Sequence, residues 1–406
     1  MSELSLNDFL RREGVAAFIV FLSVAGIIWV IFLSYSWGVE FVPKFALDDD
    51  TMHKTVIYYM INGEDFYSAW RHAAVVTGDL GDLRIFRTPL VFYPIAFLTG
   101  WAGSGFVFPL SLVCVCMAAF NLILTFWVVN RITGSGWAAL AASFVQYAFF
   151  FNVIPLFQIA LFAMPFVILA VYWAWTDHPW LAGTAIAVAF LIKETFVFAL
   201  PAILVFFLLR RQWRSAGVVT ALNIVAGGLY FIHTLIAQPI PDPTMMLSAS
   251  GPEFLLNLGS FIWFGFGLLS YNVFAPATFN GYYPTNPIPA FIPIPIFYTI
   301  LVFQVIIVWG TIGRWIFKLI RKQQMAPVPL LALALVLWLI PILFAASTHI
   351  TDFARYWMEY AVWRWFGASY VGFSLLVAFS WIDMRGAVKQ FLQAPRMMGV
   401  DEISRL

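Results

Sequence analysis

The charged residues that could do chemistry gather in one stretch of an otherwise apolar chain, between Ala46 and Pro94. Seven of the chain's 20 acidic residues lie there, together with two histidines, one lysine and three arginines. In a chain with so few charged residues, ionisable side chains are expected where the protein contacts water or binds a phosphate or a sugar. We therefore take this stretch as the candidate active-site segment and the remaining sequence as its scaffold.

Three consecutive carboxylates, Asp48, Asp49 and Asp50, lie near the start of this stretch. A carboxylate beside a bound acceptor can act as a general base that removes the proton of a hydroxyl group. A second carboxylate can orient the acceptor or help to bind a divalent cation. The alternative is structural, because acidic residues also stabilise the N-terminus of a helix through its dipole. From the residues alone, both interpretations remain open.

Two further charged sites stand at the ends of apolar runs. Lys193-Glu194 interrupts one apolar region, and His349-Ile350-Thr351-Asp352-Phe353-Ala354-Arg355-Tyr356 precedes the last one. A lysine in that setting faces water, a partner or a ligand, although a local Lys–Glu pair reaching the membrane interface also explains it. Arginine suits a phosphate because its planar fork donates two hydrogen bonds. A plain salt bridge with Asp352 or Glu359 is the alternative for Arg355.

The composition excludes a soluble protein. Of the 406 residues, 62% are hydrophobic and only 10% are charged, with a mean hydropathy of +0.88, whereas a soluble domain is about one-quarter charged. The net charge is +2 and no long basic run occurs, so no nucleic-acid partner is expected. Cys114 and Cys116 are predicted to be packing residues, because positions two apart point to different faces of a helix.

The elements that position these residues are predicted to be membrane helices. Arg11 and Arg12 precede the first apolar run, which favours a cytoplasmic N-terminus and an uncleaved first span. The loop of residues 38–88 is then extracytoplasmic. Within it we expect one short helix from the Asp48–Asp50 triplet to Asn62-Gly63, and a second from Phe66 to about Val76.

We predict an all-α polytopic bundle in a single domain of residues 1–406, with about 10 to 13 membrane segments and no separate soluble domain. Pro89–Leu98 and Phe254–Leu269 are too short for regular full spans. Arg385 and Lys389 indicate a cytoplasmic C-terminal tail. The predicted full spans are Val15–Trp37, Phe106–Val129, Trp137–Phe151, Leu156–Trp175, Trp180–Leu191, Phe196–Leu209, Val218–Ala237, Phe297–Ile316, Val328–Phe344 and Trp357–Ile382.

The first loop resembles the GT-C superfamily of polyprenyl-phosphate-sugar glycosyltransferases. Gly63-Glu64-Asp65-Phe66 is similar to the family's Gly-Asp turn, and Arg87-Thr88-Pro89-Leu90 is similar to its Lys-Pro-Pro-Leu element. Matching the turn aligns Asp48 and Asp49 with the family's acidic pair, favours Asp48, and leaves Asp50 as a helix-start residue. The resemblance is to aminoarabinose transferases, protein mannosyltransferases and polyprenyl-phosphomannose-dependent mannosyltransferases. It has motif detail over the first ~100 residues and rests on hydropathy elsewhere.

The resemblance implies roles for the other charged residues. Lys193, Arg355 and Arg87 are expected to bind the donor phosphate, although Ile192-Lys193-Glu194-Thr195 lacks the Gly-Pro of the family's lysine turn. Lipid headgroups are the alternative partners of Arg87 and of Arg84. Further substrate contacts are expected from His349, Arg84, Tyr356 and Glu194.

The sequence therefore predicts an inverting hexosyl- or pentosyltransferase of the inner or plasma membrane. A polyprenyl-phosphate sugar would donate to a hydroxyl of a lipid, glycan or protein acceptor on the extracytoplasmic face, with Asp48 or Asp49 as the base. The resemblance implies no required cofactor, and no metal site is predicted, although the third aspartate leaves a divalent metal open.

Two other classes of function remain. A transporter or flippase of lipid-linked sugars would need ionisable residues near the midplane and helices broken in paired positions. A polysaccharide polymerase or ligase is expected to use arginine-rich later loops rather than an acidic first loop.

Overall fold

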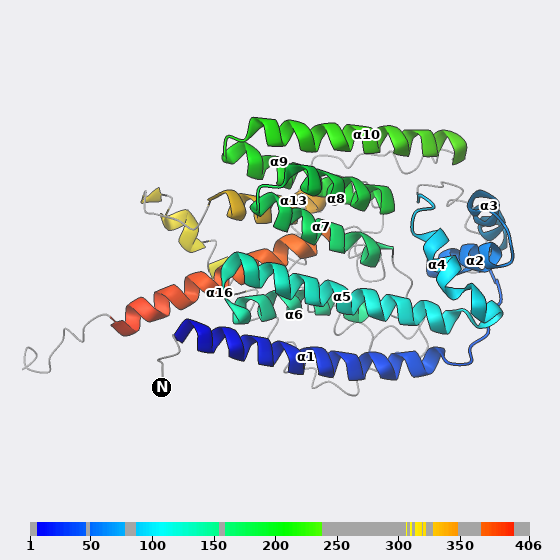
Figure 1. The fold of residues 1–406 in the computed structure, drawn as a ribbon, viewed down its shortest axis with the longest axis horizontal. Coiled ribbons are helices and arrows are strands. Elements are labelled where there is room, and N and C mark those ends of the chain that lie inside the picture. The colour runs from blue at the N-terminus through cyan, green and yellow to red at the C-terminus, as the bar shows by residue number, and fades with distance from the viewer. Residues whose placement is uncertain are drawn as a thin grey trace, which may run out of the picture.

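The chain folds as an all-α bundle in the computed structural model, which describes residues 6–45, 49–77, 87–153, 159–237, 306, 309–310, 313–318, 320–321, 328–347 and 367–393. No strand occurs among these residues, so the predicted fold class is confirmed for them. The main helices (Figure 1) are α1 (Leu6–Ser36), α2 (Asp49–Ile61), α3 (Phe66–Thr77), α4 (Phe92–Thr99), η2 (Gly100–Gly105), α5 (Val107–Thr133), α6 (Gly136–Val153), α7 (Ala160–Trp175), α8 (Pro179–Ile192), η3 (Glu194–Ala199), α9 (Leu200–Leu209), α10 (Trp213–Ala237), α13 (Val328–Ser347) and α16 (Gly367–Gln393).

The first loop contains the two short helices that its sequence predicts. α2 ends just before Asn62-Gly63, and α3 begins at Phe66. Gly63 has a φ of 96°, a backbone conformation that glycine adopts without steric cost. α4 has only eight residues and leads into the 3-10 turn η2, as the interrupted apolar run predicts. Figure 1 places α2, α3 and α4 together at one end of the bundle.

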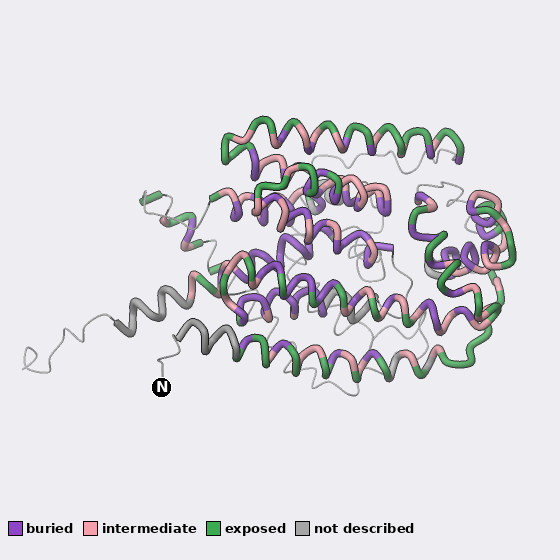
Figure 2. Tube along the Cα trace, in the orientation of Figure 1, coloured by how far each residue is buried: buried purple, intermediate pink, exposed green. Residues whose placement is uncertain are grey.

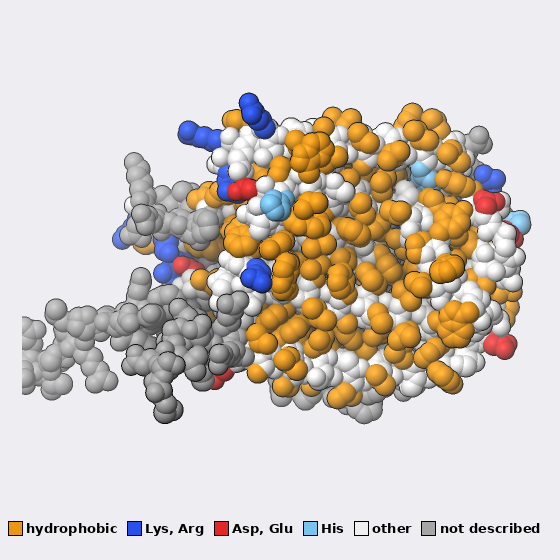
Figure 3. All heavy atoms as spheres, viewed as in Figure 1, with side chains coloured by type: hydrophobic (Ala, Val, Ile, Leu, Met, Phe, Trp, Pro, Cys, Tyr) orange, Lys and Arg blue, Asp and Glu red, His pale blue; other side chains and the backbone are white. Residues whose placement is uncertain are grey.

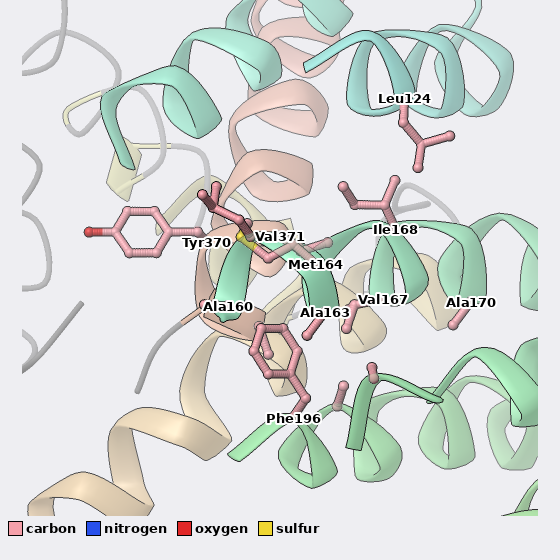
Figure 4. Close-up of a cluster of buried hydrophobic side chains, with 14 of the residues drawn as sticks. Leu124, Ala160, Ala163, Met164, Val167, Ile168, Ala170, Phe196, Tyr370 and Val371 are labelled. Carbon is pink, nitrogen blue, oxygen red and sulfur yellow. The ribbon is translucent and has the colours of Figure 1, made fainter. Parts of the chain in front are cut away.

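α7 forms the centre of the described bundle, where it contacts α5, α8, α9, α16 and η3. Its inner positions carry small residues such as Ala160 and Ala163, each at most 1% exposed, and small residues let membrane helices approach closely. Figure 4 shows Leu124 of α5, Phe196 of η3 and Tyr370 of α16 arranged around α7. Figure 2 shows exposed residues recurring along α10 and along the part of α1 whose burial is described, at the two outer edges of the bundle.

The described helices have the composition of a membrane protein. Residues 13–30 of α1, together with α5 and α10, are long and apolar enough to cross a bilayer, and five further apolar helical stretches of 10–17 residues occur in the described part of the chain. Figure 3 shows apolar side chains covering the middle of the visible face, with most Lys and Arg side chains at the end opposite α2, α3 and α4. The total number of spans stays a prediction, because Phe254–Leu269 and much of the later chain lie outside the described residues.

The contact between α13 and α16 depends on the absence of a side chain at Gly372. A Cβ there would come within 2.6 Å of the backbone nitrogen of Trp338 and 2.7 Å of the carbonyl oxygen of Ala334. We expect Gly372→Ala to lower the free energy of unfolding by about 1–3 kcal/mol through overpacking, measured by thermal unfolding in detergent. Gly217→Ala in α10 is the matched control, because nothing lies within 4 Å of its Cβ position. Equal stability of the two variants would contradict this explanation.

Candidate functional site

Buried rings hold the start of α2 against α3 and α4. The ring centroid of His53 lies 5.8 Å from that of Trp70 and 5.7 Å from that of Phe92. All three residues are at most 4% exposed. Asp49 is the first residue of α2 and therefore lies one turn from this anchored cluster. The side chain of Asp49 and the whole of Asp48 lie outside the described residues.

The turn between α2 and α3 has a structural explanation beside its family resemblance. Asp65 Oδ1 accepts hydrogen bonds from the backbone N–H groups of Tyr67 (2.9 Å) and Ser68 (3.2 Å), and Oδ2 accepts one from the Ser68 hydroxyl. Asp65 therefore caps the N-terminus of α3. These bonds, chiefly that from the Ser68 hydroxyl, hold the pKa of Asp65 below its usual value. The neighbouring Glu64 contacts Nδ1 of His72 at 2.9 Å.

Replacing Asp65 with alanine is expected to destabilise α3 by about 1 kcal/mol, because the helix loses its N-cap. Asp65→Asn is the matched control, since asparagine caps a helix without a charge. The pKa of Asp65 is lowered in the folded state, so the carboxylate's contribution is present above the unfolded value of about 3.9 and is lost as pH falls through the folded value. Hydrogen exchange of the α3 amides measures both effects. Unchanged protection in Asp65→Ala would rule out the capping role.

The segment that follows the first loop meets the C-terminal end of α8. Nη1 of Arg87 contacts Oε1 of Glu194, 107 positions away in the sequence. The adjacent Thr88 hydroxyl donates a hydrogen bond to the carbonyl oxygen of Leu191. The side chains of Arg87 and Glu194 are 20% and 27% exposed. The fold thus brings a predicted phosphate ligand together with a predicted substrate contact.

Lys193 lies at a break between α8 and η3. Its backbone is extended, with φ −147° and ψ 118°, and its carbonyl oxygen accepts a 2.9 Å hydrogen bond from the N–H of Phe196. Lys193 is only 4% exposed, which differs from a surface Lys–Glu pair reaching for water. Figure 4 shows Phe196 pointing towards α7 beside Ala160 and Ala163. This packing holds the break in place next to the Arg87–Glu194 contact.

α10 contributes residues that the sequence-based predictions missed. The hydroxyl of Tyr67 on α3 lies 3.1 Å from Nδ1 of His233 on α10. Burial raises the pKa of Tyr67, so its hydroxyl stays protonated and can donate to Nδ1. The ring of Tyr230 lies 5.9 Å from that of His233, and the Tyr230 hydroxyl is within electrostatic range of Glu194 and Arg87. A signal for these residues is present in the sequence, because polar side chains recur at helical spacing on one face of α10. The residues of that face are Val219, Asn223, Ala226, Tyr230, His233 and Ala237.

Two cationic side chains, those of Arg87 and Lys193, belong to this region of the fold. A guanidinium and an ammonium group lie at a helix break near the end of an apolar bundle, where such groups serve a ligand or a partner. Within the described ranges, no three His, Cys, Asp or Glu side chains are placed to bind a metal ion. The other predicted site residues, Arg84, His349, Arg355 and Tyr356, lie outside the described residues.

One comparison with known proteins bears on this site. Residues 88–241 match the sequence model of glycosyltransferase family 87. No curated protein and no solved structure matches the chain. The matched segment begins at Thr88 and includes Lys193, Glu194 and the polar end of α10, but it leaves out Asp48 and Asp49. The match supports glycosyltransferase activity, without distinguishing the subtypes named above.

Proposed function

We propose that this protein transfers a sugar from a polyprenyl-phosphate donor to an acceptor hydroxyl of a lipid, glycan or protein. The proposal rests mainly on one contact: the guanidinium of Arg87 pairs with the carboxylate of Glu194, beside Lys193 at the break after α8. Arg87 and Glu194 lie 107 positions apart in the sequence, and the resemblance to GT-C enzymes implies a substrate-binding role for each. The similarity of residues 88–241 to glycosyltransferase family 87 agrees with this use of the site.

The donor phosphate would bind to Arg87 and Lys193, with Arg355 as a third cation. Guanidinium and ammonium groups donate charge-assisted hydrogen bonds to phosphate, and these bonds are stronger than neutral ones. Negative charge grows on the phosphate oxygen as the bond to the anomeric carbon breaks, so cations held in place stabilise the transition state more than the ground state. Arg87 and Lys193 therefore act on binding and on the chemical step.

The acceptor hydroxyl would attack the anomeric carbon from the face opposite the phosphate, which inverts that centre. Its proton passes to Asp48 or Asp49, acting as a general base. A carbon–oxygen bond to the acceptor forms, the bond to phosphate breaks, and polyprenyl phosphate leaves with both bonding electrons. The leaving phosphate needs no general acid. The mechanism requires no cofactor.

We place the α2, α3 and α4 end of the bundle on the extracytoplasmic side and both termini in the cytoplasm. Most Lys and Arg side chains on the visible face gather at the opposite end (Figure 3), and positive charge is enriched on the cytoplasmic side of membrane proteins. A donor in the outer leaflet would then reach Lys193 laterally from the lipid.

The test is a transfer assay on the purified protein in lipid nanodiscs. Short-chain isoprenyl-phosphate sugars are expected to release isoprenyl phosphate in the presence of acceptor, whereas nucleotide sugars are not. The same protein in liposomes is expected to give no sugar-lipid flux without transfer. Flux in the absence of any transfer would overturn the proposal in favour of a transporter or flippase.

A further inference from the structure

The carboxylate of Glu194 occupies an unusual position for a site that is proposed to bind an anion. Its Oε1 contacts Nη1 of Arg87, one of the cations assigned to the donor phosphate. Its Oε2 is buried, and no hydrogen-bond partner for that oxygen lies among the described residues. An ionised carboxylate has no hydrogen-bond donor, so both of its oxygens can only accept hydrogen bonds. Glu194 therefore presents negative charge beside any phosphate that binds to Arg87.

We propose that Glu194 selects the charge of the phosphate ester, so that the site favours a phosphodiester with one negative charge over a phosphomonoester with two. This inference rests on the proposed function. The polyprenyl-phosphate sugar is a diester and carries one charge. The polyprenyl phosphate left after transfer is a monoester, with a second ionisation near pH 6 and hence close to two charges at neutral pH.

Simple electrostatics gives the direction of the selection. The repulsion between Glu194 and a bound phosphate is proportional to the charge of that phosphate. The attraction of Arg87 and Lys193 grows in the same proportion, so a site with two cations alone would bind the dianionic product more tightly than the donor. Among the described residues, Arg87, Lys193 and Glu194 carry formal charges of +1, +1 and −1, so Glu194 halves the formal charge that these residues offer to a phosphate. With the net attraction weakened in this way, the cost of removing the phosphate from water decides the preference, and that cost is greater for a dianion than for a monoanion.

The geometry keeps Glu194 in place while a phosphate binds. The hydrogen bond from Thr88 to the carbonyl of Leu191 fixes the segment of Arg87 against the end of α8. Phe196 is 1% exposed and anchors η3 immediately after Glu194. An arginine side chain has five N–H donors, so one guanidinium can contact a carboxylate and a phosphate together. Glu194 would thus weaken product binding and speed its release.

The experiment compares two probes with the same tail. Farnesyl phosphate is the monoester, and its methyl ester is the diester. Binding is measured by calorimetry with the purified full chain in nanodiscs at about pH 8, where the monoester is a dianion, and at about pH 5.5, where it is mostly a monoanion. The wild-type protein is expected to prefer the diester at the higher pH and to lose that preference at the lower one.

In Glu194→Gln, monoester affinity at about pH 8 is expected to rise about tenfold relative to diester affinity, which corresponds to about 1.4 kcal/mol. Asp177→Asn is the matched control, because Asp177 forms another carboxylate–arginine pair, with Arg210 in the turn after α9. That variant is expected to leave both affinities unchanged. The wild-type pH comparison tests the inference even if Glu194→Gln does not fold.

Two results separate the inference from the function on which it rests. If Arg87→Gln weakens both probes but Glu194→Gln changes their affinities equally, the charge selection by Glu194 is wrong and the anion site stands. If Arg87→Gln leaves the binding of both probes unchanged, the donor site itself has been misplaced.

Discussion

Replacing Lys193 with methionine is expected to lower kcat/KM for sugar transfer by about 10²- to 10³-fold, the effect of removing one fixed donor from a site of developing negative charge. Methionine keeps much of the length and apolar bulk of lysine while removing the ammonium group. Lys193 is 4% exposed at the break between α8 and η3. A phosphate that binds there is shielded from water, so each ionic contact counts for more than it would at a surface.

The loss should appear in both kinetic constants. A weaker ground-state contact with the donor phosphate raises KM, and a weaker contact with the leaving phosphate lowers kcat. Lys318→Met is the control, because it removes the charge of another lysine, one that pairs with Asp383 at 3.2 Å and lies apart from the proposed site. Because removing one member of a buried charged contact is often strongly destabilising, thermal unfolding of Lys193→Met is measured first, and the kinetic constants are compared at a temperature at which the variant is folded. Wild-type transfer by a folded Lys193→Met protein would remove Lys193 from the donor site.

Local features of the fold could be predicted because their causes lie close together in the sequence. α2 and α3 end and begin within a residue or two of the predicted positions, since Asn62-Gly63 stops one helix and Asp65 caps the next. The eight-residue α4 follows from the glycines that interrupt its apolar run. The packing of α7 at the centre could not be predicted, because the helices around it are all similarly apolar and carry no pairing signal.

The candidate site also has features that could be predicted from the sequence and features that could not. Residue type drew attention to Lys193 and Glu194, because charge is costly in an apolar chain, and the family resemblance supplied the expected roles of both residues and of Arg87. Their contact could not be predicted, since nothing in the sequence specifies that Arg87 meets Glu194 across 107 positions. Tyr230 and His233 were missed because single polar residues in an apolar helix usually bond to neighbouring helices. Asp65 was given weight as part of a motif, and its hydrogen bonds assign it the role of a helix cap.

Asparagine at one of positions 48 and 49 is expected to lower kcat for sugar transfer by about 10²- to 10⁴-fold, the contribution of a general base. The KM for the donor should change little, because the base contacts the acceptor rather than the donor phosphate. The argument from structure is the anchoring of α2: Met52 and Val56 are fully buried, and the ring of His53 lies against Trp70 and Phe92. A group at the start of such a helix is held on a rigid element, as a catalytic base must be.

Three variants make that assignment decisive: Asp48→Asn, Asp49→Asn and the control Asp50→Asn, which should retain activity because Asp50 is expected only to start the helix. The inactive variant should also lose the acid limb of the kcat profile, since that limb reports protonation of the base in the bound complex. Donor binding, measured separately by calorimetry, should stay at the wild-type level. Wild-type turnover in both Asp48→Asn and Asp49→Asn, with Glu194→Gln inactive, would move the base from the first loop to the end of α8. The carboxylate beside Arg87 would then take the acceptor proton itself.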